Sequence, residues 1–285
     1  MIYFDNAATT FNKPDIVYDK VLNTLKNKAG NPDRGSNQIS LAASREVFKT
    51  RQKLADLLRV KDSREITFTK NATEANNLIL KGLLEQGDHV IISSLEHNAI
   101  YRPLNRLREQ REIELSIANT EGGKADFLRK VEQAIKPQTK LIAVTHVSNL
   151  TGNILPVKEL GEIAQANGVG FLVDSAQSAG CLEIDVTDLK ADFLTFTGHK
   201  ALFGPQGVGG AYINSEFRLL PLIEGGSGGD SKNKVNPDIL PDRYESGTLN
   251  VQAIAGLGAG IDFINQISLT KILKYKDSLL EHLTS

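Results

Sequence analysis

GFLVDSAQSAG (residues 170–180) and DFLTFTGHKALFGPQGVGG (residues 192–210) are the stretches that decide the fold. Each opens with a short apolar run rich in Phe, Leu and Val and then turns polar, at Asp174 in the first stretch and at Thr197 in the second. Short apolar runs that lie between helical patterns and end in turn signals are typical of buried parallel strands. We therefore expect two strands of an α/β sheet here.

Polar residues at the ends of these two strands predict a ligand site. Ligands of open α/β sheets lie outside the carboxyl ends of the strands, so Asp174 and Lys200 are expected at one edge of the sheet, facing one ligand. A lysine in a mostly apolar setting forms Schiff bases with carbonyls, and pyridoxal phosphate uses such a lysine with an acid at its pyridinium nitrogen. Either residue alone is more typical of a solvated strand end.

Composition excludes several classes of protein. The 285 residues suffice for one large domain or two smaller ones. With 33 basic and 34 acidic residues and a net charge of −1, nucleic acid and membrane surfaces are not expected as partners. The start of the chain lacks a signal-peptide pattern and no apolar run reaches the length of a bilayer span, so we expect a cytoplasmic protein. The single cysteine, Cys181, excludes an internal disulfide, and the five histidines lack the spacing of metal ligands.

Strands and helices are expected to alternate through the middle of the chain. Strand patterns occur at Glu65–Thr69, HVIISS (89–94), IELSIAN (113–119) and KLIAVTHVSNLTGN (140–153), with helical patterns between them. This order is the signature of a parallel sheet covered on both faces. GPQGVGGAYIN (204–214) is expected to add an edge strand, and Ser40 is expected to cap a long helix over 40–60.

Three further features belong to the expected site. Asn71 and Glu74 fit a capping box, and the helix start that they mark, with the Thr73 hydroxyl, is suited to binding a phosphate; a well-capped helix without a ligand is the alternative. His97 and Asn149 each follow a predicted strand, although a lone histidine in a loop is more often structural.

The glycines at 256, 258 and 260 follow no strand, so they indicate close helix packing and not a dinucleotide fingerprint.

Seven motifs, in order along the chain, resemble the class V aminotransferase family and are closest to its cysteine desulfurase-like members. They are YFDNAATT, FTKNATEANN, SLEHNAI, HVSNLTGN, VDSAQSAG, FTGHKALFGPQGVGG and ESGTLN. The resemblance extends to about Gly260. It implies a pyridoxal phosphate enzyme of fold type I, a transferase with a mostly parallel seven-stranded sheet and helices on both faces.

The resemblance also implies roles for individual residues. Lys200 would form the Schiff base with the cofactor and move the substrate α-proton, Asp174 would pair with the pyridinium nitrogen, and His97 would stack on the ring. The other implied contacts are Gln177 and Asn149 on the side of the phenolic oxygen, Ala72, Thr73, Thr197 and His199 at the phosphate, and Thr248 at the phosphate of the neighbouring subunit. The last contact implies a homodimer.

The family pattern continues into a small C-terminal domain, whereas this sequence ends at Ser285 within a helical pattern. We expect an N-terminal arm over 1–15, a large cofactor-binding domain over 16–250, and over 251–285 a linking helix and the start of an incomplete C-terminal domain. The small domain that holds the substrate arginine and the nucleophilic cysteine loop of desulfurases is expected to be largely absent, and Cys181 is expected to be buried and inert.

Two classes of function follow from this pattern. The favoured one is conversion of L-cysteine to L-alanine with sulfur transfer. This chain is expected to be inactive alone unless a partner fragment supplies the C-terminal domain. A sulfur acceptor protein is expected as a further partner. The alternatives are an aminotransferase, lyase or epimerase that acts on another small amino acid, or a non-catalytic fragment that binds the cofactor.

Overall fold

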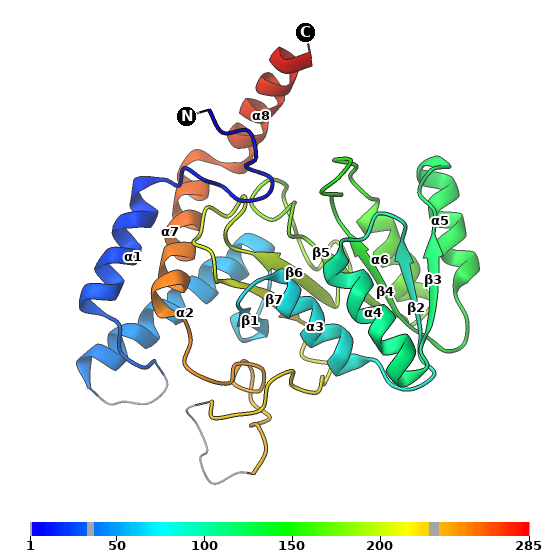
Figure 1. Cartoon of the computed structure of the whole chain (residues 1–285), viewed down its shortest axis with the longest axis horizontal. Coiled ribbons are helices and arrows are strands. Elements are labelled where there is room, and N and C mark those ends of the chain that lie inside the picture. Colours follow the sequence, from blue (N-terminus) through cyan, green and yellow to red (C-terminus); the bar gives the residue numbers. More distant parts are fainter. Residues whose placement is uncertain (1, 33–36, 228–233, 285) are drawn as a thin grey trace.

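A seven-stranded sheet forms the centre of the protein in the computed structural model, which describes residues 2–32, 37–227 and 234–284 (Figure 1). The strands lie in the order β1-β7-β6-β5-β4-β2-β3. Neighbouring strands from β3 through β2, β4 and β5 to β6 are parallel, whereas β7 is antiparallel to both β1 and β6. The mostly parallel α/β fold predicted from the sequence is therefore confirmed. The strands are β1 (Ile66–Thr69), β2 (His89–Ser93), β3 (Glu114–Ala118), β4 (Thr139–Thr145), β5 (Gly170–Asp174), β6 (Phe193–Thr197) and β7 (Gly209–Ile213).

Helices cover both faces of the sheet. One apolar core joins the sheet to α2 (Gln38–Leu58), α5 (Gly123–Ala134), α6 (Val157–Ala166) and α7 (Val251–Ile267). A second core, on the other face, joins it to α3 (Ala72–Leu83) and α4 (Asn98–Arg111). The remaining helices are α1 (Asp15–Asn27), which packs beside α7, a 3₁₀ turn η1 (Ser63–Glu65), and α8 (Leu269–Thr284), which points away from the body (Figure 1).

Strand β7 corrects one prediction from the sequence, because it lies inside the sheet and not at its edge. Its two glycines explain the position. A Cβ atom on Gly210 would lie 2.4 Å from the Thr67 carbonyl oxygen, and one on Gly209 would lie 2.7 Å from the Asn71 Cα. Glycine in this strand therefore marks a close approach of neighbouring backbone.

The start of α2 corrects a second prediction. The cap is Asn37 and not Ser40, since the Asn37 Oδ1 accepts hydrogen bonds from the Ile39 and Ser40 backbone N–H groups. The Asn71 half of the predicted box at α3 is confirmed, because the Asn71 Oδ1 accepts from the Glu74 N–H at 2.9 Å. The Glu74 Oε2 accepts at 2.6 Å from the N–H of Lys70, one residue before the cap expected as its donor.

The glycine cluster of α7 lies against three neighbouring elements, as predicted for close packing. A Cβ atom on Gly256 would lie 2.5 Å from the Val21 side chain of α1, and one on Gly258 would lie 2.4 Å from the Thr50 hydroxyl of α2. At Gly260 it would lie 2.2 Å from the Leu202 carbonyl oxygen. Helix α7 thus supports the loop that follows β6.

The described ranges contain neither a membrane-spanning helix nor a metal-binding cluster. No helix in them has the length and apolar content needed to cross a membrane, and they contain no group of three or more His, Cys, Asp and Glu side chains arranged to hold a metal ion. The segments 29–37 and 219–242, whose Gly, Pro and Asn residues are typical of loops, each include residues outside the described ranges, and their described parts contain no helix or strand.

Candidate active site

A cavity of about 240 Å³ lies at the carboxyl ends of five strands. Nine of the ten residues that the sequence predicts for the site line it: Ala72, Thr73, His97, Asn149, Asp174, Gln177, Thr197, His199 and Lys200. They follow β1, β2, β4, β5 and β6, which end at the same edge because these strands share one direction. Residues separated by more than 120 positions in the sequence therefore face one cavity.

Asp174, which lines this cavity, is held in one orientation by two hydrogen bonds. It is buried, with 3% of its surface exposed. The Asn76 Nδ2 donates to its Oδ2 at 2.9 Å, and the Ala176 backbone N–H donates to its Oδ1 at 2.9 Å. Asn76, itself fully buried, also accepts from the Thr195 hydroxyl at 3.0 Å. Sequence reasoning missed Asn76 and Thr195. The pattern that points to Asn76 is a polar residue on the buried face of α3.

Lys200 lies in the connection between β6 and β7, which is closed by its own backbone. The Gly198 N–H donates to the Val208 carbonyl, and the Phe203 N–H donates to the Lys200 carbonyl. Burial lowers the pKa of the Lys200 amine, and the nearby Asp174 carboxylate opposes this change. Burial, with the Lys200 and Lys13 cations, also lowers the pKa of His199. The setting therefore favours a lysine that gives up its proton more readily than a solvated one.

The N-terminal arm closes over this connection. The Thr10 hydroxyl donates to the Lys200 carbonyl at 2.8 Å, and the Thr10 N–H donates to the His199 carbonyl at 3.0 Å. The Thr9 Oγ1 lies 3.0 Å from the His199 Nδ1. Sequence reasoning assigned no role to these threonines, because contacts over 190 positions leave no local pattern.

The start of α3, whose first backbone N–H groups have no acceptor within the helix, lies at the same cavity. Asn71, Ala72 and Thr73 line the cavity there, and α3 is 12 residues long. The buried Thr197 hydroxyl, which lines the same cavity, has no hydrogen-bond partner among the described residues. A helix start and a hydroxyl without a partner at one cavity are suited to an anion with several oxygens.

His97 caps α4 and so has a defined ring orientation. Its Nδ1 accepts from the Ala99 N–H at 3.1 Å, so the ring proton of the neutral side chain lies on Nε2. The preceding residue, Glu96, accepts hydrogen bonds from the Ser93 hydroxyl and the Thr145 N–H. Burial raises the pKa of the Glu96 carboxyl to about 8, with a smaller contribution from Asp174, so this acid is mostly neutral at pH 7.

Thr248 lies outside this cavity. It is exposed, and its Oγ1 lies 3.5 Å from the Asn31 Nδ2. The three residues at 243–245, in contrast, are buried. The segment is thus fixed to the body just before it presents Thr248 to solvent.

Cys181 is buried, as expected from the sequence. The Lys276 Nζ of α8 donates to its Sγ at 3.1 Å. The thiol therefore faces the terminal helix, and it is not among the residues that line the cavity.

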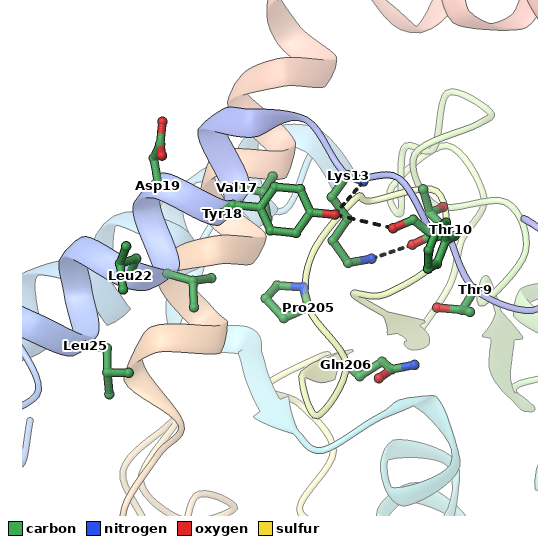
Figure 2. A pocket seen from close by; sticks show the side chains of 12 residues that line it. Thr9, Thr10, Lys13, Val17, Tyr18, Asp19, Leu22, Leu25, Pro205 and Gln206 are labelled. Atoms are coloured by element: carbon green, nitrogen blue, oxygen red, sulfur yellow. Dashed lines mark hydrogen bonds between the residues drawn. The ribbon is translucent and has the colours of Figure 1, made fainter. Parts of the chain in front are cut away.

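A larger cavity of about 620 Å³ lies between the N-terminal arm, α1 and the Pro205–Gln206 turn (Figure 2). Its walls are mostly apolar, formed in part by Val17, Leu22 and Leu25. The Lys13 Nζ donates to the Thr10 carbonyl at 2.7 Å, and burial lowers the pKa of this amine. The acid–lysine pair lies in the smaller cavity, which is therefore the candidate site.

Comparison with known proteins agrees with this geometry. Residues 2–285 match the family Aminotransferase class-V. The chain is 38% identical over 295 residues to a probable cysteine desulfurase of Pyrococcus abyssi, covering all of this chain and 72% of that protein. It is 36% identical to a probable cysteine desulfurase of Methanothermobacter thermautotrophicus, covering 99% of this chain and 71% of the relative.

A solved structure gives the same result. The apo structure of a cysteine desulfurase from Thermococcus onnurineus superimposes with a TM-score of 0.92 at 37% identity, covering 99% of this chain and 72% of that one. Fold, motifs and relatives agree, and the chain belongs to the class V aminotransferase family, in its cysteine desulfurase-like group.

Proposed function

We propose that this chain binds pyridoxal 5'-phosphate at the cavity of Asp174 and Lys200 and serves in the desulfuration of L-cysteine. The main observation behind this proposal is that one cavity contains the buried, oriented Asp174 carboxylate, Lys200 with its lowered pKa, and a helix start suited to an anion. The relatives, both probable cysteine desulfurases, favour cysteine over other small amino acids as the substrate.

The phosphate end of the cofactor fits the start of α3. The Thr73 and Thr197 hydroxyls and the backbone N–H groups at Ala72 and Thr73 would hold it, with His199 alongside. The support is that Thr197 has a buried hydroxyl with no partner among the described residues, a cost that a phosphate oxygen would remove. Thr248 is exposed and does not line the cavity of its own subunit, so it would bind the phosphate in a second subunit. A homodimer is therefore part of this proposal.

The ring end of the cofactor fits the residues around Asp174. Asp174 would hold the pyridinium nitrogen in its protonated form, since a carboxylate fixed by Asn76 and Ala176 favours a cation beside it. His97 would stack on the ring, and Gln177 and Asn149 would contact the phenolic oxygen side. The Gln177 Nε2 donates to the Ala7 carbonyl at 3.3 Å, which ties this contact to the arm.

Lys200 would hold the cofactor covalently and move the α-proton of the substrate. When bound, pyridoxal phosphate supplies an electron sink that stabilises the negative charge left on the substrate carbon. The lowered pKa of Lys200 raises the fraction of neutral amine near pH 7, the form that accepts a proton. Arm residues Thr9 and Thr10 would keep the lysine loop in place during this transfer.

The wider proposal concerns organisation and location. Residues 1–15 would be an arm, 16–250 the cofactor-binding domain and 251–285 a linking helical segment. A cytoplasmic location is proposed because a chain with one cysteine shows no disulfide framework of the kind typical of secreted proteins. A sulfur acceptor protein is the proposed partner.

The test is borohydride reduction of the purified chain with pyridoxal phosphate, followed by peptide mass mapping. The expected result is a stable adduct on Lys200 that is lost in Lys200→Ala. Lys13, the amine of the neighbouring cavity, is the matched control, so Lys13→Ala should keep the Lys200 adduct. Adducts scattered over exposed lysines would refute the site. Release of alanine and sulfide from L-cysteine, compared with other small amino acids, then tests the reaction.

A further inference from the structure

The outer edge of strand β1 pairs with no further strand, and two side chains bind its backbone instead. β1 pairs with β7 and ends the sheet on that side. On the other side, the Phe68 N–H donates to the Glu245 Oε1 at 2.6 Å, and the Ile66 carbonyl accepts from the Arg51 guanidinium. These are the backbone groups that a further strand would have paired. Arg51 and Glu245 therefore take the place of a neighbouring strand.

The two side chains also bind each other. The Arg51 Nη1 lies 2.7 Å from the Glu245 Oε1, and the Nη2 lies 2.8 Å from the Oε2. Both residues are more than nine-tenths buried, at 6% and 7% exposure, and the Arg51 guanidinium lies 4.6 Å from the centre of the Phe68 ring. A two-point pair of this kind fixes orientation as well as distance.

The pair joins two stretches that the proposed function assigns to phosphate binding. β1 ends at Thr69, directly before the start of α3 at Asn71–Thr73. Glu245 lies three residues before Thr248. On its other side, the Arg243 Nε donates to the Leu219 carbonyl at 3.0 Å, so the segment is fixed before Glu245 as well. A shift of Glu245 would therefore be transmitted in two directions, to the start of α3 and to Thr248.

We propose that Arg51 and Glu245 are positioning residues. Within one subunit they fix the start of α3, which binds that subunit's own phosphate, relative to Thr248, which reaches the phosphate of the second subunit. The inference rests on the proposed function. The ligand group concerned is the dianionic phosphate ester of the cofactor, and neither residue touches it.

The test compares two ligands that differ in the phosphate alone, pyridoxal phosphate and pyridoxal. Glu245→Gln removes the charge and one arm of the pair. Because this leaves Arg51 buried without its counter-charge, the double variant Arg51→Met/Glu245→Gln is made as well; it removes both charges and keeps an amide oxygen for the Phe68 N–H. Affinities are measured from the absorbance change on binding, and melting temperatures are recorded alongside.

The double variant is expected to bind pyridoxal phosphate about tenfold more weakly, the loss of roughly one hydrogen bond to a charged group. Its affinity for pyridoxal is expected to stay within about twofold of the parent, because the ring contacts are unchanged. Glu46→Gln is the matched control: Glu46 is a buried carboxylate on the same helix, held by Lys20 and Lys28, and its loss should leave the preference for the phosphate unchanged.

An unchanged preference for pyridoxal phosphate in the double variant, whatever its melting temperature, would overturn the inference and leave the pair a structural one. Equal weakening of both ligands would overturn it too. The proposed function fails separately, in the parent, if the parent binds neither ligand at Lys200; the inference then falls with it.

Discussion

Replacement of Asn76 by Asp provides a sharp test of the geometry around Asp174. The change keeps the size of the side chain and exchanges the amide nitrogen for an oxygen. In the parent, that nitrogen lies 2.9 Å from the Asp174 Oδ2. Two carboxylate oxygens would then face each other inside the protein, where Asn76 is fully buried.

The size of the effect follows from this distance. Two full charges 2.9 Å apart repel by about 6 kcal/mol at an effective dielectric constant of about 20. This repulsion is equivalent to more than four pKa units at about 1.4 kcal/mol each, so the pair of acids keeps one proton at pH 7. In the unfolded chain the new Asp loses its proton at a pKa of about 3.9. Above that pH the folded state binds more protons than the unfolded state, so the free energy of unfolding decreases by about 1.4 kcal/mol per pH unit.

The assay is thermal unfolding of parent and variant, without added cofactor, at pH 5 and pH 7. Relative to the parent, the variant should lose about 3 kcal/mol over this range, which lowers its melting temperature by roughly 5–10 °C. Asn77→Asp, which adds the same charge at the next, half-buried position of α3, should show no such slope. Parallel pH dependences of parent and Asn76→Asp would refute the proximity of the two side chains.

Two other predictions concern stability. Burial lowers the pKa of His146 to about 4, so the folded state resists its protonation, and stability present above pH 6.5 is lost as the pH falls; between pH 6.5 and 5 the loss is about 2 kcal/mol. His146→Gln should remove this part of the acid sensitivity in melting curves at pH 7 and pH 5, and an unchanged slope would contradict the assignment. Gly260→Ala would bring a Cβ atom to 2.2 Å from the Leu202 carbonyl oxygen, so we expect a loss of about 1–3 kcal/mol by urea unfolding, in spite of alanine's higher helix propensity. A variant as stable as the parent would show that the loop after Lys200 is not held by α7.

The sequence predicted those parts of the fold and site that leave a local pattern. Strand ends at Asp174 and Thr197 were predictable because apolar runs give way there to polar residues. The Asn71 cap of α3 was predictable because Asn71 and Glu74 lie within one helical turn. The interior position of β7 was not, since a run of glycine fits an exposed turn as well as a close approach between strands.

The supporting contacts of the site were hidden for a different reason. Asn76 and Asp174 are 98 positions apart, and Arg51 and Glu245 are 194 apart. A buried asparagine on α3 and a buried arginine on α2 look like ordinary polar members of amphipathic helices until the fold gives them partners. Single-sequence reasoning therefore found the residues that face the cavity and missed those that hold them in place.

The contacts of Thr9 and Thr10 with the lysine loop also have a consequence for biosynthesis. These threonines are synthesised before their partners at His199 and Lys200, which are made 190 residues later. At about 5–20 residues per second, the arm waits about 10 to 40 s before its partners exist. The threonines therefore form these contacts only after the lysine loop has been made, and a ribosome that stalls before Lys200 leaves Thr9 and Thr10 without these partners.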